Sequence, residues 1–158
     1  KGPETMTGTV EARLKELGID LPTPSTPAAN YIPYTVVGST VFVAGQVCVW
    51  NGEITCRGRL GEDVAKEDGY KAARVCGLNL IAQVREACGG DLDRVVRVAK
   101  LGGFVNSTAD FTDHPEVVNG ASDLMVEVFG EAGKHARFAV GAPALPRDLR
   151  DSLTDDAA

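Results

Sequence analysis

The chain has 158 residues, of which 44% are apolar and 24% charged, the balance of a soluble globular protein. This length suits one domain with a core of useful size. The net charge of −6 and the pI near 4.9 argue against a broad basic face for nucleic acid or for an anionic membrane.

No apolar run approaches the length that crosses a bilayer, and no secretory signal is visible. Residues 1–5 precede Met6 and resemble a remnant of cloning, so we expect the native start at Met6. The four cysteines form no C-x-x-C pair and the two histidines lack finger spacing, which argues against a metal site. We therefore expect reduced thiols in a cytoplasmic protein. Cys76 is expected to lie on a helix and to pack in the core as a small apolar side chain.

The N-terminal part predicts a short helix followed by a meander of strands. Residues 8–18 carry an apolar stripe at helical spacing, and the proline-rich stretch 19–33 predicts an extended connector. Apolar and β-branched runs at 34–37 and 40–44 flank Gly38-Ser39, a two-residue hairpin signal. A second hairpin signal, Asn51-Gly52, follows the run 47–50.

Two longer helices and two further strands complete the predicted order. Residues 62–88 predict a helix with Asp63 as its N-cap, ended by Gly89-Gly90. Apolar runs at 95–98 and 101–105 bracket one strand. The second helix begins at the cap-and-proline segment 112–115 and continues with an unbroken apolar stripe to Phe129, and residues 137–142 form the last clear strand.

This order predicts an α+β domain in which two helices cover one face of a mixed sheet and leave the other face bare. A small sheet with an uncovered, partly apolar face normally packs against a second subunit. We divide the chain into the helix and connector at 6–33, a main domain at 34–146, and a polar, disorder-prone tail at 147–158.

The strand at 137–142 begins with a charged residue, Arg137, where apolar side chains would be buried. A buried charge without a partner is costly, so the guanidinium needs an anion. One interpretation is a salt bridge to an Asp or Glu of the chain, and the other is a small carboxylate ligand held by two parallel hydrogen bonds. The residue pattern alone does not decide between them.

Other candidate motifs favour structural roles. The glycines form neither G-x-G-x-x-G nor a P-loop, so nucleotide binding is not indicated. Ser122 and Ser152 lack a histidine and an acid in a recognised arrangement, so neither is favoured as a nucleophile. His135 would share the strand face of Arg137 if the strand began early, and is otherwise a surface residue. His114 is interpreted as part of a helix cap.

Several segments together resemble the RidA/YjgF family, also called endoribonuclease L-PSP, in its branch with an extra N-terminal helix. The resemblance covers residues 10–146. It rests on Tyr34, VAGQ at 43–46, GFVNS at 103–107, VNGASDLMVEVFGE at 118–131, and HAR...LP at 135–146.

The resemblance implies a chorismate-mutase-like α+β fold, a homotrimer, and ligand clefts between subunits. It also implies hydrolysis of reactive enamines and imines, such as 2-aminoacrylate, to 2-keto acids and ammonia, without a cofactor. The family arginine, which pairs with the substrate carboxylate, falls on Arg137. The family tyrosine falls on Tyr34, which would close the cleft from the neighbouring subunit, and further substrate-binding positions fall on Gly45 and Asn119.

The chain departs from the family pattern near its C-terminal end. The family's acidic residue, six positions after the proline of L-P, falls on Ser152, and the adjacent Asp151 would face the other side of a strand. Phe138 replaces a small residue beside the arginine and would narrow the cleft. The ending is also more polar than the family's usual final strand.

Three hypotheses follow. The first is an enamine or imine deaminase with Arg137 as the carboxylate anchor. The second is a non-catalytic trimer that binds a small carboxylate as a sensor or regulator. The third is an endoribonuclease, an activity within the family, which the acidic charge balance disfavours.

Overall fold

The computed structural model describes residues 8–27, 29–146 and 151–157, and of the last range only the backbone. It contains one five-stranded sheet in the order β1-β2-β7-β5-β6 and a small separate pair, β3-β4. The elements in chain order are α1 Thr9–Glu16, β1 Tyr34–Val37, β2 Thr40–Val47, β3 Val49–Trp50, β4 Glu53–Ile54, α2 Lys66–Ala87, η1 Leu92–Arg94, β5 Val98–Asn106, α3 His114–Phe129, η2 Gly130–Gly133, β6 Ala136–Ala142 and β7 Asp151–Ala157.

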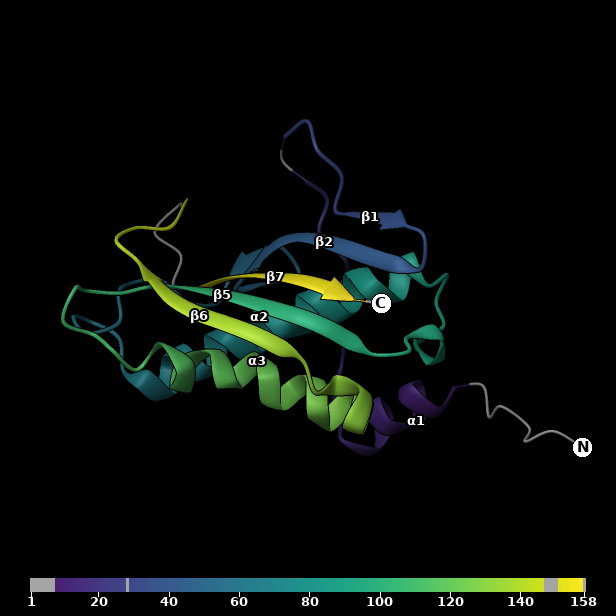
Figure 1. The fold of residues 1–158 in the computed structure, drawn as a ribbon. Helices are drawn as coiled ribbons and strands as arrows, with labels where there is room; N and C mark the ends of the chain where they lie inside the picture. The colour runs from purple at the N-terminus through teal and green to yellow at the C-terminus, as the bar shows by residue number, and fades with distance from the viewer. Residues whose placement is uncertain (1–7, 28, 147–150, 158) are drawn as a thin grey trace, which may run out of the picture.

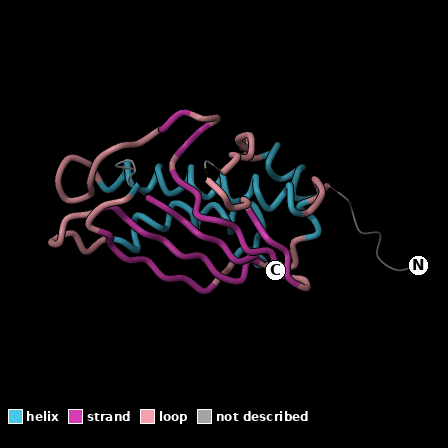
Figure 2. Tube along the Cα trace, turned by 90° about the horizontal axis from the view of Figure 1, so that it is seen from above, coloured by secondary structure: helices cyan, strands magenta, loops and turns pink. Residues whose placement is uncertain are grey.

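The two long helices lie side by side against one face of the sheet, as Figures 1 and 2 show. Both helices contribute large, fully buried side chains to the core, among them Leu80 of α2 and Leu124 of α3. Gly120 lets α3 approach α2 closely, because a Cβ at this position would overlap the carbonyl oxygen of Tyr70. The expected α+β architecture, with two helices on one face of a mixed sheet, is therefore confirmed.

The sheet is antiparallel except at one edge, where β6 runs parallel to β5. α3 supplies the crossover between these two strands, because parallel neighbours cannot be joined by a tight turn. Arg137 lies opposite Leu101 in this pairing, and Gly141 lies opposite Val105. Since Leu101 and Val105 are fully buried under the helices, Arg137, Ala139 and Gly141 belong to the helix-covered side of the sheet.

The polar ending is the main correction to the expected fold. Residues 151–157, which we expected to be an irregular tail, form β7 between β2 and β5. Both edges of β7 are hydrogen-bonded to neighbouring strands, and backbone pairing of this kind does not require apolar side chains. A polar sequence can therefore occupy the middle of the sheet.

The turn signals correctly located both hairpins. Val37 pairs with Thr40 across Gly38-Ser39, and Trp50 pairs with Glu53 across Asn51-Gly52. Asn51 and Gly52 both have positive φ, at 48° and 89°, which is the backbone that a two-residue hairpin requires. The second hairpin forms its own two-stranded sheet rather than extending the main one.

Asp63 is not the N-cap of α2, which begins at Lys66 with Ala65 as its cap. The Asp63 carboxylate instead accepts a hydrogen bond of 2.6 Å from the backbone N–H of Arg59 and closes the preceding turn.

None of the helices in the described residues combines the length and the apolar character that a membrane span requires.

The helix-free face of the sheet carries a cluster of exposed and half-buried apolar side chains, Phe42, Phe104, Phe138 and Val140, here called the open-face cluster. Phe42, Phe104 and Val140 are each about two-fifths exposed, at 43%, 38% and 43%. The rings of Phe104 and Phe138 meet edge to face with centroids 5.4 Å apart. Phe138 therefore points away from the helix-covered side on which Arg137 lies, and within one chain it does not crowd the guanidinium.

The N-terminal helix is fixed by a carboxylate from a distant loop. The α1 N-cap, Gly8, has no side chain to cap the helix, and Asp93 of η1 accepts hydrogen bonds of 2.9 Å from the backbone N–H groups of Thr9 and Val10. The N–H groups of Val10 and Thr9 lower the pKa of Asp93 below its ordinary value of 3.8.

We expect Asp93→Ala to lower the Tm at neutral pH by about 2–4 °C, since a lost helix cap typically has this effect in a domain of this size. Because the folded-state pKa is lowered, the contribution is complete above the unfolded pKa and disappears as pH falls through the lower folded value. The Tm difference between variant and wild type should therefore vanish in strong acid. Thermal unfolding of Asp110→Ala, an exposed loop carboxylate, provides the control, and an equal Tm loss there would contradict a capping role.

Candidate functional site

Arg137 is the second residue of β6, the edge strand of the sheet, and its side chain is exposed. The side chain extends over the edge towards α3, which runs antiparallel to β6. Nη1 donates hydrogen bonds to Asn119 Oδ1 at 2.7 Å and to Ser122 Oγ at 3.2 Å. Both partners are neutral, and none of the ion pairs within the described ranges includes Arg137.

His135 is linked to the same cluster through Ser122. Its Nδ1 lies 2.6 Å from the carbonyl oxygen of Gly133, and its Nε2 lies 2.9 Å from Ser122 Oγ. A carbonyl oxygen only accepts, so Nδ1 carries a proton, and Nε2 is free to contact the Ser122 hydroxyl. The Ser122 hydroxyl accepts from Arg137 and also bonds His135, which forms a continuous chain of three side chains.

Local sequence spacing explains why these side chains meet. Asn119 and Ser122 stand at i and i+3 on α3 and so project from the same side of the helix. His135 and Arg137 stand two residues apart and so share one side of an extended segment. The short helix η2 lies between α3 and His135 and turns the chain back close to α3. The approach is tight, since a Cβ at Gly133 would overlap the carbonyl oxygen of Met125.

Of the predicted site residues, the structure brings Arg137 and Asn119 into direct contact but places Tyr34 and Gly45 elsewhere. Tyr34 begins β1, at the opposite edge of the sheet, and Gly45 lies in β2 beside it. Strands β7 and β5 separate β2 from β6, so Gly45 is at least three strand spacings, or about 14 Å, from β6. Within one chain the four residues do not form a single site.

Sequence reasoning underestimated Ser122 and His135. Ser122 was weighed only as a nucleophile, and its observed role is to connect His135 with Arg137. The spacings N-x-x-S on a helix and H-x-R on a strand were the available signals, because each places its two side chains on one face.

The guanidinium retains binding capacity. Its hydrogen bonds to the described residues use Nη1 alone, which leaves Nε and Nη2 without a partner in that part of the chain. These two atoms form the planar edge that binds a carboxylate through two parallel N–H···O bonds. The arrangement can therefore hold and orient a small carboxylate while Asn119 and Ser122 fix the other side of the guanidinium.

The position of the family acid lies in β7, where Ser152 pairs with Phe104 and Asp151 with Val105. No group of three or more His, Cys, Asp or Glu among the described residues is arranged to hold a metal ion.

Comparison with known proteins identifies relatives over nearly the whole chain. Residues 11–153 match the model of the family described as "YjgF/chorismate_mutase-like, putative endoribonuclease". Protein TCP17 of Trypanosoma cruzi is 46% identical over 140 residues, which are 88% of this chain and 87% of that protein.

Two solved structures resemble the chain throughout. The protein Atu1372 of Agrobacterium tumefaciens superposes with a TM-score of 0.87 at 42% identity, over 94% of this chain and 91% of that one. A protein of Shewanella oneidensis MR-1, described as a "putative endoribonuclease", superposes with a TM-score of 0.90 at 38% identity, over 94% and 98% of the two chains.

We expect Ser122→Ala to loosen Arg137 without unfolding the protein. The variant removes one of the two acceptors of Nη1, and the loss of one exposed hydrogen bond costs about 1 kcal/mol of unfolding free energy. The readout is faster hydrogen exchange of the Arg137 guanidinium protons by NMR, with Ser39→Ala as the matched hydroxyl control. A lower Tm with unchanged guanidinium exchange would show that Ser122 contributes to packing but does not restrain Arg137.

Proposed function

The chain belongs to the RidA/YjgF family, and from this membership and the geometry at Arg137 we propose that it is an enamine and imine deaminase. Its substrates are small reactive carboxylates of the 2-aminoacrylate type, and its products are 2-keto acids and ammonia. The observation that carries the proposal is Arg137 itself, a guanidinium with two neutral partners and an Nε–Nη2 edge that no described residue occupies.

The proposed reaction needs positioning more than redox or cofactor chemistry. The enamine takes up a proton at its terminal carbon to become an imine. Water adds to the imine carbon, and the resulting carbinolamine releases ammonia to leave the keto acid. A guanidinium that binds the carboxylate in a bidentate manner holds the reacting carbon, one bond away, in a constant place, and such orientation lowers the barrier by limiting the motion of the substrate.

Asn119 and Ser122 fix the guanidinium without neutralising it. A carboxylate partner of the protein would compete with the substrate for the same donors, whereas an amide and a hydroxyl oxygen leave the full positive charge available. His135 restrains the Ser122 hydroxyl in turn. We propose these three as positioning residues for the anchor.

We further propose that the working form is a homotrimer. The open-face cluster presents an apolar surface that no helix covers, and surfaces of this kind commonly become subunit contacts. Tyr34 and Gly45 lie far from Arg137 within one chain, so they join it only if a neighbouring copy supplies them. In this proposal Tyr34 closes the cleft across the subunit boundary.

Ser152 at the family acid position favours a second candidate, a trimer that binds a small carboxylate without turning it over. Loss of a general acid or base costs about two to four orders of magnitude in rate. The carboxylate anchor would survive this loss, and the protein would then act as a sensor or regulator.

The decisive assay follows keto-acid formation from 2-aminoacrylate generated enzymatically from serine. We expect Arg137→Met to lower the protein-dependent rate by at least about 10²-fold, since a displaced substrate loses its orientation. Arg137→Lys should restore little, because an ammonium cannot form the two-pronged contact. Arg97→Met, at another exposed arginine, is the control.

Each outcome separates the candidates. A wild-type rate equal to the protein-free rate, with a 2-keto acid still raising the Tm, would overturn the deaminase and support the binding trimer. RNA cleavage that survives rigorous purification and disappears in Arg137→Met would instead support the endoribonuclease.

The trimer has its own test. Light scattering after size exclusion should give three times the chain mass of 16.6 kDa. Phe138→Lys should shift this mass towards the monomer, since a charge would be buried in the apolar contact. Val126→Lys, an exposed apolar position on α3, should leave the mass unchanged. A monomeric wild type would exclude the proposed trimer.

A further inference from the structure

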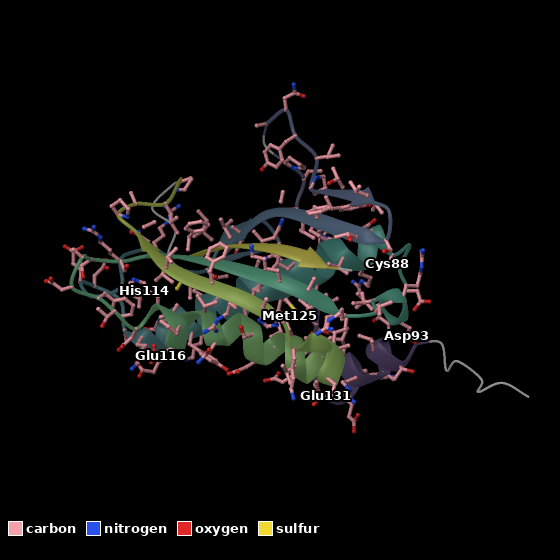
Figure 3. All side chains as sticks on the ribbon, viewed as in Figure 1. Cys88, Asp93, His114, Glu116, Met125 and Glu131 are labelled. Atoms are coloured by element: carbon pink, nitrogen blue, oxygen red, sulfur yellow. The ribbon has the colours of Figure 1, made fainter. Side chains whose placement is uncertain are left out.

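A second polar cluster lies at the other end of β6 from Arg137, around a cavity of about 380 Å³. Its walls come from the loop before α2, the loop after β5, the start of α3 and the end of β6. Figure 3 shows His114 at the end of α3 away from Glu131, on the side where β5 and β6 end. The residues that matter for the argument are Arg59, Ser107, Phe111, His114 and Gly141.

Backbone hydrogen bonds hold these walls in place. Leu60 donates to the carbonyl of Asn106 at 2.9 Å and accepts from the N–H of Thr108 at 2.9 Å. Ser107 donates to the carbonyl of Ala142 at 3.2 Å, which ties the loop after β5 to the end of β6. The cavity is therefore a formed part of the fold, as ligand sites usually are.

Arg59 brings a positive charge to this cavity that the described chain does not neutralise. Its Nη2 donates to the carbonyl of Pro143 at 3.2 Å, and its Nε is buried without a hydrogen-bond partner among the described residues. The nearby Asp63 carboxylate is bound to the backbone N–H of Arg59 rather than to the guanidinium. No ion pair among the described residues includes Arg59. A cationic group in this state favours an anion in the cavity.

Ser107 and His114 supply a second polar point on the wall, with Ser107 Oγ 3.1 Å from His114 Nε2. Gly141 lets this pair pack directly against β6. A Cβ at Gly141 would lie 2.6 Å from His114 Nε2 and 2.7 Å from Ser107 Oγ, so any larger residue would displace the pair. Phe111, whose ring meets His114 edge to face at 5.3 Å, adds an apolar surface.

The cavity is separate from the Arg137 site. Gly141 is four residues further along β6, or about 13 Å away at the usual rise of a strand. Both clusters lie on the helix-covered side of the same strand, but the Arg137 cluster uses Asn119 and Ser122 in the middle of α3, whereas the cavity uses His114 at its first residue. No residue is shared between them.

We propose that this cavity is a second ligand site, specific for a small organic anion. The acid group pairs with Arg59, a polar substituent meets Ser107 and His114, and the apolar body rests on Phe111. The volume lies within the usual range for small-molecule sites and exceeds what an inorganic ion would fill. The shared chemistry of the ligand is an acid group on an apolar frame, either a carboxylate or a phosphate ester.

The test is a titration of the full chain with benzoate, phenyl phosphate, inorganic phosphate and neutral benzamide, followed by two-dimensional NMR. We expect benzoate or phenyl phosphate to shift the resonances of His114 and Gly141, and the stronger of the two identifies the acid group. Benzamide should bind at least tenfold more weakly, because it lacks the charge that Arg59 recognises.

Variants locate the binding. Arg59→Met should weaken the anion at least tenfold, and Gly141→Ala should do so while retaining the guanidinium. The Tm of each variant, compared with that of the wild type, guards against a folding defect in either. Arg137→Met and Arg97→Met should bind as the wild type does, so the result is independent of the deaminase assay.

Several results would overturn the proposal. These are no shift at His114 or Gly141 with any probe at millimolar concentration, equal binding by Arg59→Met, or anion binding that Arg137→Met abolishes and Arg59→Met retains. Equal binding of benzamide and benzoate would also overturn it, since the site would then recognise the ring alone.

Discussion

The parallel pairing of β6 with β5 determines on which side of the sheet Arg137 and Gly141 lie, and both sites are built around these two positions. A parallel neighbour must be reached by a crossover, and α3 is that crossover, so the helix runs back along the strand that it delivers. The register that sets Arg137 opposite Leu101 turns the guanidinium towards α3. There Asn119 and Ser122, three residues apart on the helix, accept its hydrogen bonds. A shift by one residue would turn Arg137 to the open face and expose Phe138 to the helices.

The same pairing separates two chemistries on one strand. Arg137 lies at an exposed edge, where its neutral partners orient the charge and the solvent still reaches it. Arg59 reaches the far end of β6 from a loop, and one of its nitrogens is buried without a partner in the described part of the chain. An exposed guanidinium exchanges ligands readily, whereas a partly desolvated one gains more from each hydrogen bond that an anion supplies.

The sequence was sufficient for the features that local chemistry determines. Helical periodicity located α2 and α3, and Gly38-Ser39 and Asn51-Gly52 located the hairpins, because each depends on nearby residues alone. The resemblance identified Arg137 and Asn119, which the structure brings into contact. It could not place Tyr34 and Gly45 relative to Arg137, since strand order follows from long-range pairing. The prediction of Asp63 as an N-cap was wrong, since its carboxylate accepts from the backbone N–H of Arg59 instead. The sequence did not predict β7, because backbone pairing with β2 and β5, and not its composition, makes this segment a strand.

The central place of β7 has a consequence for how the protein is made. During synthesis the chain emerges from its N-terminal end, so β2 and β5 are both complete before the strand that separates them exists. Until then each offers an unpaired row of N–H and C=O groups, which are open to pairing with other nascent chains. The sheet closes only when residues 151–157 arrive, so a ribosome stalled upstream of them would hold a chain with its helices formed and its sheet divided in two.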